Sequence, residues 1–186
     1  MKRCQWAQDN LMIDYHDKEW GRPLHNDRKL FEMLILEGAQ AGLSWLTILK
    51  RRRTYRKAFA NFDPLIVSKF TQKDIQRLLH DEGIIRNKLK IASAINNAKQ
   101  FIEIQKEFRT FDKYIWSFVK NKPINNKYKK ISEIPATTIL SDEMSKDLKK
   151  RGFNFVGSTI CYAFMQSIGM VNDHMTGCFL YEKRSA

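Results

Sequence analysis

The feature that most constrains this chain of 186 residues is a pair of histidine/cysteine half-sites at its two ends. Cys4 and His16 lie near the start, and His174 and Cys178 lie near the end with an i,i+4 spacing that suits one face of a helix. Together they supply the four soft ligands that a tetrahedral structural zinc takes. A zinc ion bound by all four would join the ends of the chain and close a loop of nearly its full length.

Neither half-site is a strong zinc motif by itself, because known zinc sites carry tighter pairs of ligands. The alternative is that Cys4 is a free thiol near a frayed end and that His174 is an ordinary surface residue. Cys161 lies in an apolar segment, where we expect it to be buried. An odd number of cysteines without a secretory signal argues against a disulfide scaffold.

The composition favours a cytoplasmic protein with a polyanionic partner. The chain carries 33 Lys and Arg against 20 Asp and Glu, a formal net charge of +13. It has no apolar run that would span a bilayer and no apolar stretch of a secretory signal near its start. We therefore expect no membrane association, and nucleic acid is the favoured partner.

Helical patterning dominates the chain and alternation with a period of two is scarce, which predicts an all-α fold without a substantial sheet. Gly152 and Gly169 are expected to end helices, the second of which covers about 158–168. The segment 120–138 is poor in apolar residues and is expected to be a surface connection. The predicted N-cap residues are Asp27, Ser44, Asp63, Thr71, Asn87 and Ser141.

A short turn containing glycine lies between two helical patterns, and the second pattern starts with cationic residues. Such a turn can direct free main-chain N–H groups at a phosphate, which predicts a helix-hairpin-helix over about 72–105 that grips DNA without reading its sequence. A simple turn between two helices with a solvated basic face is the alternative. The predicted DNA contacts are Gly83, Ile85, Arg86, Lys88 and Lys90, with Lys149, Lys150 and Arg151 as a second cluster.

Four large aromatic residues, Trp6, Tyr15, Trp20 and Trp45, lie in the first quarter of the chain. Clusters of this kind are usually core. Glu37 lies among apolar helical positions, where an acid is costly to bury without a partner. A buried acid among rings would suit a flat cationic ligand such as an alkylated purine. A solvated Glu37, or one in a salt bridge, is the alternative.

Several of these residues belong to segments that follow one another in the order of a known family. They are residues 3–6 (RCQW), 15–21 (YHDKEWG), 31–33 (FEM), 37–45 (EGAQAGLSW), 83–86 (GIIR), 117–119 (SFV), 149–157 (KKRGFNFVG) and 172–178 (NDHMTGC). By these segments the chain resembles the bacterial DNA-3-methyladenine glycosylase I family over nearly its whole length. That collinearity is more specific than any single motif.

The resemblance implies one unit over 1–186 with the all-α helix-hairpin-helix DNA glycosylase fold. It also implies zinc-binding terminal segments over about 1–20 and 172–180, because Cys4, His16, His174 and Cys178 match the ligands of the family. Four protein ligands leave no open position for a catalytic water, so the zinc would be structural. Unlike most of the wider superfamily, this family is not expected to carry a catalytic aspartate on the helix after the hairpin.

The resemblance further implies a monofunctional enzyme of base-excision repair, without lyase activity. It would flip 3-methyladenine out of alkylated double-stranded DNA at the nucleoid, hydrolyse the glycosidic bond and leave an abasic site, and a monomer would suffice. Met12 stands where relatives are expected to have an aromatic residue, which leaves open a shifted lesion preference. A zinc-stabilised protein that binds damaged DNA without cutting is the other alternative. The implied roles are catalysis for Glu37, base binding for Trp6, Tyr15, Trp20 and Trp45, and filling of the vacated stack for Leu43.

Overall fold

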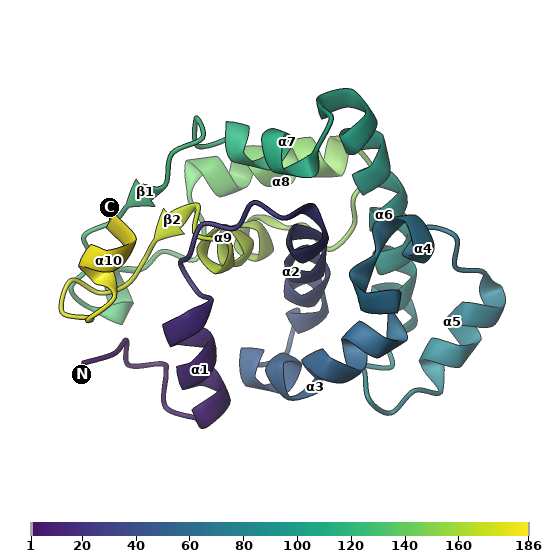
Figure 1. Cartoon of the computed structure of the whole chain (residues 1–186), viewed down its shortest axis with the longest axis horizontal. Helices are drawn as coiled ribbons and strands as arrows, with labels where there is room; N and C mark the ends of the chain where they lie inside the picture. Colours follow the sequence, from purple (N-terminus) through teal and green to yellow (C-terminus); the bar gives the residue numbers. More distant parts are fainter. Residues whose placement is uncertain (1, 186) are drawn as a thin grey trace.

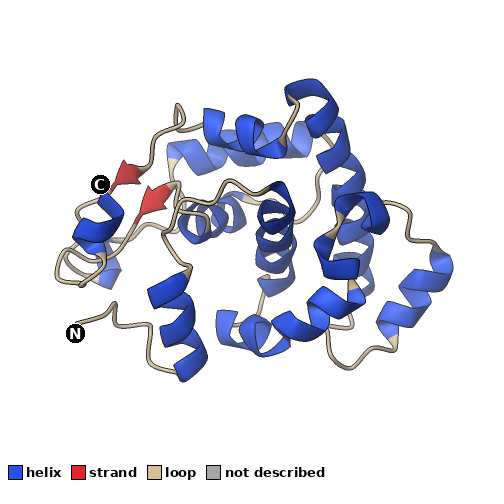
Figure 2. Ribbon diagram, in the orientation of Figure 1, coloured by secondary structure: helices blue, strands red, loops and turns tan. Residues whose placement is uncertain are grey.

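The computed structural model describes residues 2–185, and most of the described residues are helical (Figures 1 and 2). Met1 and Ala186, the ends of the expected unit, lie outside the described residues. In chain order the elements are α1 Asn10–Lys18, α2 Asp27–Gln40, α3 Trp45–Ala58, η1 Ala60–Phe62, α4 Pro64–Val67, α5 Gln72–Leu79, α6 Lys88–Phe108, α7 Phe111–Ser117, β1 Ile124–Asn125, η2 Ile131–Glu133, α8 Ile139–Lys150, α9 Ser158–Ser167, β2 Val171–Asn172 and α10 Tyr181–Ser185.

The only sheet within residues 2–185 is the parallel pair β1 and β2, which places Ile124 opposite Val171 and Asn125 opposite Asn172. This pair joins the segment that follows α7 to the segment that follows α9, as Figure 1 shows at the left. The prediction of a mostly helical fold without a substantial sheet is confirmed. No helix within the described residues has the length and apolar character needed to cross a membrane.

Local sequence explains where most helices begin. The side chains of Ser44, Asp63 and Asn87 each accept a main-chain N–H group from the first turn of the helix that follows. Thr71 forms a capping box with Asp74 at the start of α5. These four predicted caps are confirmed.

Two predicted caps are wrong, and in each case a competing hydrogen bond explains the difference. Asn26 caps α2, because the carboxylate of Asp27 instead accepts the first two main-chain N–H groups of α7. Thr138 caps α8, and Ser141 stands in its first turn, where the two residues bond each other reciprocally. The predicted stops are confirmed, since Gly152 and Gly169 follow α8 and α9 with positive φ.

Helix α2 lies in the middle of the molecule and positions the site. It packs against α3, α6, α7 and α9, and every residue from 30 to 39 is buried. A helix buried on all sides is expected to be apolar all round. Glu32 and Glu37 are the charged residues within this buried stretch, so each needs a physical explanation.

Candidate functional site

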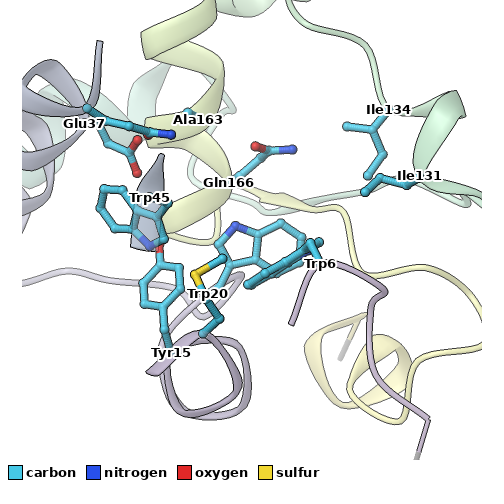
Figure 3. Close-up of a pocket in the computed structure, with 11 residues that line it drawn as sticks. Trp6, Tyr15, Trp20, Glu37, Trp45, Ile131, Ile134, Ala163 and Gln166 are labelled. Atoms are coloured by element: carbon cyan, nitrogen blue, oxygen red, sulfur yellow. The ribbon is translucent and has the colours of Figure 1, made fainter. Parts of the chain in front are cut away.

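The structure brings Glu37 and the four predicted aromatic residues together around one cavity of about 380 Å³ (Figure 3). Trp6 precedes α1, Tyr15 belongs to α1, Glu37 belongs to α2, and Trp45 begins α3. Three separate elements are therefore needed to build the wall. The cavity is completed by Met12, Gln40, Ile131, Ile134, Ala163 and Gln166.

The aromatic rings fix one another by tilted and edge-on contacts. The ring centroids of Trp6 and Trp20 lie 5.0 Å apart at 78°, and those of Tyr15 and Trp45 lie 5.3 Å apart at 50°. The indole N–H of Trp45 is buried and has no acceptor within residues 2–185. The cavity thus offers ring faces and one carboxyl group to a ligand.

Glu37 is 4% exposed and makes no ion pair with any residue in the described range. Burial raises the pKa of its carboxyl group to about 8, and a hydrogen bond from Ser167 opposes that rise in part. The free protein therefore holds this acid mostly protonated at neutral pH. Neither alternative weighed for Glu37, a solvated residue or a salt bridge, describes its position.

Ser167, near the end of α9, is a site residue that the sequence analysis did not single out. Its buried hydroxyl donates to the main-chain oxygen of Phe164 at 2.9 Å, and it acts on the side chains of Glu37 and Tyr15 by lowering the pKa of each. The only sequence signal was a polar residue in an apolar helix. Recognising its role requires knowing that α9 packs on α2.

The segment 120–138 is more than the surface connection that was expected. Ile131 and Ile134 of this segment line the cavity wall facing Trp6 (Figure 3). Their contribution depends on how the segment is folded back by the β1–β2 pair, which the local sequence does not reveal.

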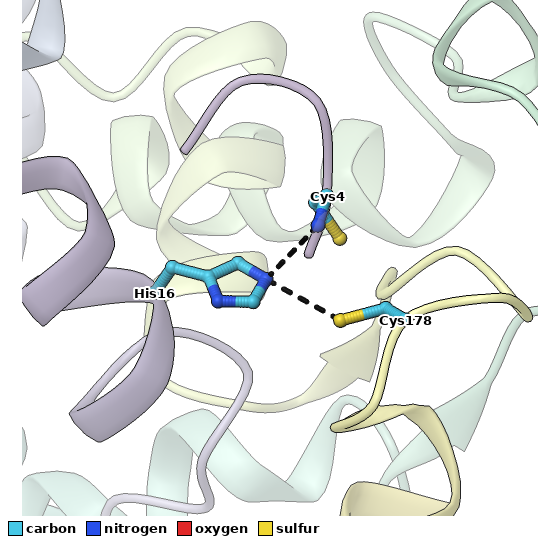
Figure 4. A group of neighbouring side chains, drawn as sticks. All are labelled: Cys4, His16 and Cys178. Atoms are coloured by element: carbon cyan, nitrogen blue, oxygen red, sulfur yellow. Dashed lines mark hydrogen bonds between the residues drawn. The ribbon is translucent and has the colours of Figure 1, made fainter. Parts of the chain in front are cut away.

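Three of the four predicted metal ligands meet in a buried cluster (Figure 4). The ligand atoms of Cys4, His16 and Cys178 all lie within 4.8 Å of one another, and the Nε2 atom of His16 is 3.5 Å from the Sγ atom of Cys178. Two thiols and an imidazole are donors that zinc prefers. Cys4 is thus buried in a cluster and does not lie at a frayed end.

His174 lies beside this cluster, with its ring centroid 5.0 Å from that of His16. It is buried, not a surface residue, and its Nε2 atom has no partner within the described residues. The Nδ1 atoms of the two rings are held by Asn172 at 2.9 Å and by Asp17 at 2.8 Å. Asn172 and Asp17 therefore fix both rings. The Nε2 atom of His16 lies 3.5 Å from the main-chain nitrogen of Cys4 and 3.5 Å from the Sγ atom of Cys178, and two thiols with two imidazoles are a donor set that suits zinc.

The expected helical placement of His174 and Cys178 is wrong. The segment after β2 forms turns, and the main-chain N–H of Cys178 donates to the main-chain oxygen of Met175 at 2.7 Å. The buried carboxylate of Asp173 fixes this non-helical segment by accepting hydrogen bonds from other elements. Its donors are Asn126, Tyr162 and Gln166.

Helices α5 and α6 are joined by the predicted turn, which is attached to α3. Thr54 of α3 donates to the main-chain oxygen of Gly83, and a Cβ atom at Gly83 would lie 2.7 Å from the Cβ atom of Thr54. Only glycine fits this close approach. The structure therefore explains why the turn contains this residue.

Two of the predicted DNA contacts in this turn, Gly83 and Ile85, have main-chain N–H groups that are already hydrogen-bonded. Those of Gly83 and Ile85 donate to Asp81 and to the hydroxyl of Tyr55. Within residues 2–185, the N–H groups that find no acceptor at this end of α6 are those of Arg86, Lys88 and Leu89. The turn is held by α3, and the first residues of the helix present the free donors.

The predicted cationic contacts differ in their surroundings. Arg86, Lys88, Lys149 and Lys150 are exposed. Lys90 instead donates to two main-chain oxygens at the C-terminal end of α2, which favours a structural role for it. The remaining residue of the second cluster is Arg151, which pairs with Asp147 and Glu107.

Leu43 lies in the turn between α2 and α3 and is 39% exposed. The residue before it, Gly42, has a φ of +76°, which glycine adopts readily. The turn thus exposes an apolar side chain between the two helices that supply Glu37 and Trp45 to the cavity.

The family model described as methyladenine glycosylase matches residues 5–181. The chain belongs to the methyladenine glycosylase family. The family resemblance inferred from the collinear segments is confirmed.

Named members of this family are similar to the chain over almost their whole length. DNA-3-methyladenine glycosylase 1 of Escherichia coli is 50% identical over 182 residues, 97% of each chain. DNA-3-methyladenine glycosylase of Haemophilus influenzae is 48% identical over 177 residues, 95% of this chain and 96% of the relative. A structure showing 3-methyladenine recognition by 3-methyladenine DNA glycosylase I from Staphylococcus aureus is 35% identical, with a TM-score of 0.94 and 97% of each chain covered.

Proposed function

We propose that this protein is a DNA glycosylase that excises 3-methyladenine from alkylated double-stranded DNA and leaves an abasic site. The observation that carries the proposal is the buried Glu37 in an aromatic cavity, within a chain 50% identical to a named 3-methyladenine glycosylase. A protein that only grips damaged DNA through its backbone needs no acid in such a cavity. The geometry therefore favours the enzyme over the non-enzymatic alternative.

Base selection follows from the charge of the lesion. The 3-methyladenine nucleotide carries a positive charge that adenine lacks. Inside the cavity this charge would favour the ionised form of Glu37, which then accepts hydrogen bonds from the edge of the base. Tyr15 and Trp45 add cation–π attraction, and Trp6 and Trp20 complete the wall. Uncharged adenine would leave Glu37 protonated or would face an unpaired buried carboxylate.

The chemistry requires little help, because the charged nucleotide releases a neutral base. Extrusion costs a few kcal/mol, and stacking on the rings returns about 1–3 kcal/mol. Leu43 would fill the vacated stack. A water molecule attacks the sugar, and Glu37 stabilises the developing positive charge. We expect no Schiff base and no lyase activity, and this expectation is supported by the lack of a lysine among the described residues that line the cavity.

The α5–turn–α6 unit would act as the helix-hairpin-helix that holds the DNA backbone. The free N–H groups of Arg86, Lys88 and Leu89 at the start of α6 can bind a phosphate, and the side chains of Lys149 and Lys150 can add charge. Such contacts carry no sequence information and weaken with salt. The whole chain, residues 1–186, would form a single glycosylase unit that acts as a monomer on DNA of the nucleoid.

Cys4, His16, His174 and Cys178 would hold a structural zinc. The converging thiols and the unpaired Nε2 atom of His174 support this assignment. With four protein ligands the metal supplies folding stability and no catalytic water. Cys178→Ala should reduce the zinc content of the purified protein and lower its Tm. Unchanged values of both would contradict the assignment, and Cys161→Ala, at a buried cysteine outside the cluster, is the matched control.

Chromatography of the bases released from methylated duplex DNA tests the proposed activity. The wild type should release 3-methyladenine, and Glu37→Gln should keep its fold but lose about 100-fold or more of the excision rate. Glu103→Gln, at an exposed acid on α6, should match the wild type. The proposal fails if the wild type releases no base, and the role of Glu37 fails if its variant excises normally.

A further inference from the structure

A dense group of positive charge borders the cavity on a segment that the proposed DNA grip does not use. Residues 120–130 contain five lysines and no acid. Lys127, Lys129 and Lys130 are exposed and directly precede Ile131, which lines the cavity. Charge is thus concentrated where an extruded base would enter.

The main chain beneath these lysines is held in place from several sides. The carboxylate of Glu133 accepts the main-chain N–H groups of Lys129 and Lys130 at 2.7 and 3.4 Å. The main-chain oxygen of Tyr128 accepts the N–H of Thr176 at 2.9 Å. A fixed loop presents charge at a defined place, at a lower entropic cost on binding than a mobile loop.

The lysine side chains themselves lack acidic partners. No ion pair within residues 2–185 involves Lys127, Lys129 or Lys130, whereas Arg52 and Arg151 are each paired with two acids. The closest acid in the sequence is Glu133, which is bonded to the main chain. Glu133 offsets part of the charge of Lys129 and Lys130, but three lysines without an ion pair, next in sequence to a residue that lines the cavity, still attract a polyanion.

We propose that Lys127, Lys129 and Lys130 form a second phosphate-binding surface, the lysine rim, which holds the DNA strand next to the extruded nucleotide. This proposal rests on the proposed function. A base inside the cavity leaves its sugar and flanking phosphates at the mouth, which Ile131 borders. In Figure 1 the segment between β1 and α8 lies at the left and the α5–α6 turn lies at the lower right, with α1 and α3 between them. The strand is then held on both sides of the cavity.

The salt dependence of DNA binding distinguishes phosphate contacts made by the lysine rim from a non-specific effect of the protein's net positive charge. Each neutralised phosphate contributes about 0.9 to the slope of log Kd against log salt concentration. Binding of duplex DNA with a stable abasic analogue, followed by fluorescence anisotropy, gives the slope for each variant. Replacing all three rim lysines by Gln should lower the slope by about 2–3 and weaken binding about tenfold or more at moderate salt.

A matched control removes three charges elsewhere. Lys29, Lys99 and Lys113 are exposed on α2, α6 and α7 and make no ion pair within the described residues, and α7 lies at the upper edge of Figure 1, away from the α5–α6 turn. Replacing them by Gln should leave the slope unchanged. An unaltered slope in the rim variant, or an equal fall in both triple variants, would overturn the proposal.

Two further measurements distinguish a role of the lysine rim in DNA binding from a role in base excision. Arginine at the three rim positions should retain the wild-type slope, because the charge is kept. Single-turnover excision at saturating DNA should be unchanged in the Gln variant, since the cavity is intact, and a loss there would contradict a pure binding role. If the slope depends on the rim but the wild type releases no base, the rim stands and the proposed enzymatic function fails.

Discussion

Two buried glutamates on α2, five residues apart, have opposite surroundings. Glu32 lies between Arg52 and Arg56, with closest contacts of 2.6 and 2.9 Å. Glu37 faces a cavity with aromatic walls and has a serine hydroxyl in place of a cation. The same helix thus carries one acid whose charge is already compensated and one whose charge is left for a ligand. Partners, not burial, distinguish a structural acid from a functional one.

The largest expected difference between the two acids is in stability and activity. Glu32→Gln removes one side of a buried ion pair, so it should lower the free energy of unfolding by about 3–5 kcal/mol. Its excision rate per folded molecule should stay near that of the wild type. Denaturant titration together with the base-release assay measures both quantities. A stable Glu32→Gln variant without activity would reverse the comparison.

The pH dependence of the free energy of unfolding tests the second part of the comparison, that Glu37 is buried without a cation. Because the pKa of Glu37 is about 8 in the folded protein and near 4.5 when unfolded, the folded state binds the extra proton between these values. Stability is therefore lost as pH rises from 4.5 to 8, by about 5 kcal/mol in total for this group. Glu37→Gln should gain stability over the wild type across that range, as measured by unfolding at several pH values. A constant difference between the two proteins would show that Glu37 has an ordinary pKa.

A smaller effect is expected at Ser167. Removing its hydroxyl in Ser167→Ala should raise the pKa of Glu37 by up to about one unit, because the bond that favours the carboxylate is lost. If the ionised acid is the active form, the rise of kcat/KM with pH should move to higher pH by that amount. The other titratable side chain in contact with Ser167 is Tyr15 of α1, and Arg52 and Glu19 act electrostatically on that tyrosine.

The control for this prediction is Ser145→Ala. Ser145 is buried on α8 and donates to the main-chain oxygen of Val156, away from the cavity. It should leave the pH profile unchanged. Identical profiles for the wild type and Ser167→Ala would remove Ser167 from the site.

The sequence was most informative where the signal is local or chemically unusual. Caps such as Ser44 and Asn87 act within one turn, and Glu37 stands out as an acid among apolar positions. Ser167 and Ile131 act on the cavity only through packing between distant segments, so no local pattern reveals them. Asp27 illustrates the same limit, because its carboxylate is taken by a helix more than eighty residues away.

The contact between the two ends of the chain also bears on synthesis. Trp6 and Tyr15 leave the ribosome long before Cys178, which lies against His16 in the folded protein. A nascent chain can fold its middle helices while the wall of its cavity still lacks an anchor. A translation product that stops before Cys178 is thus expected to be unable to retain a base.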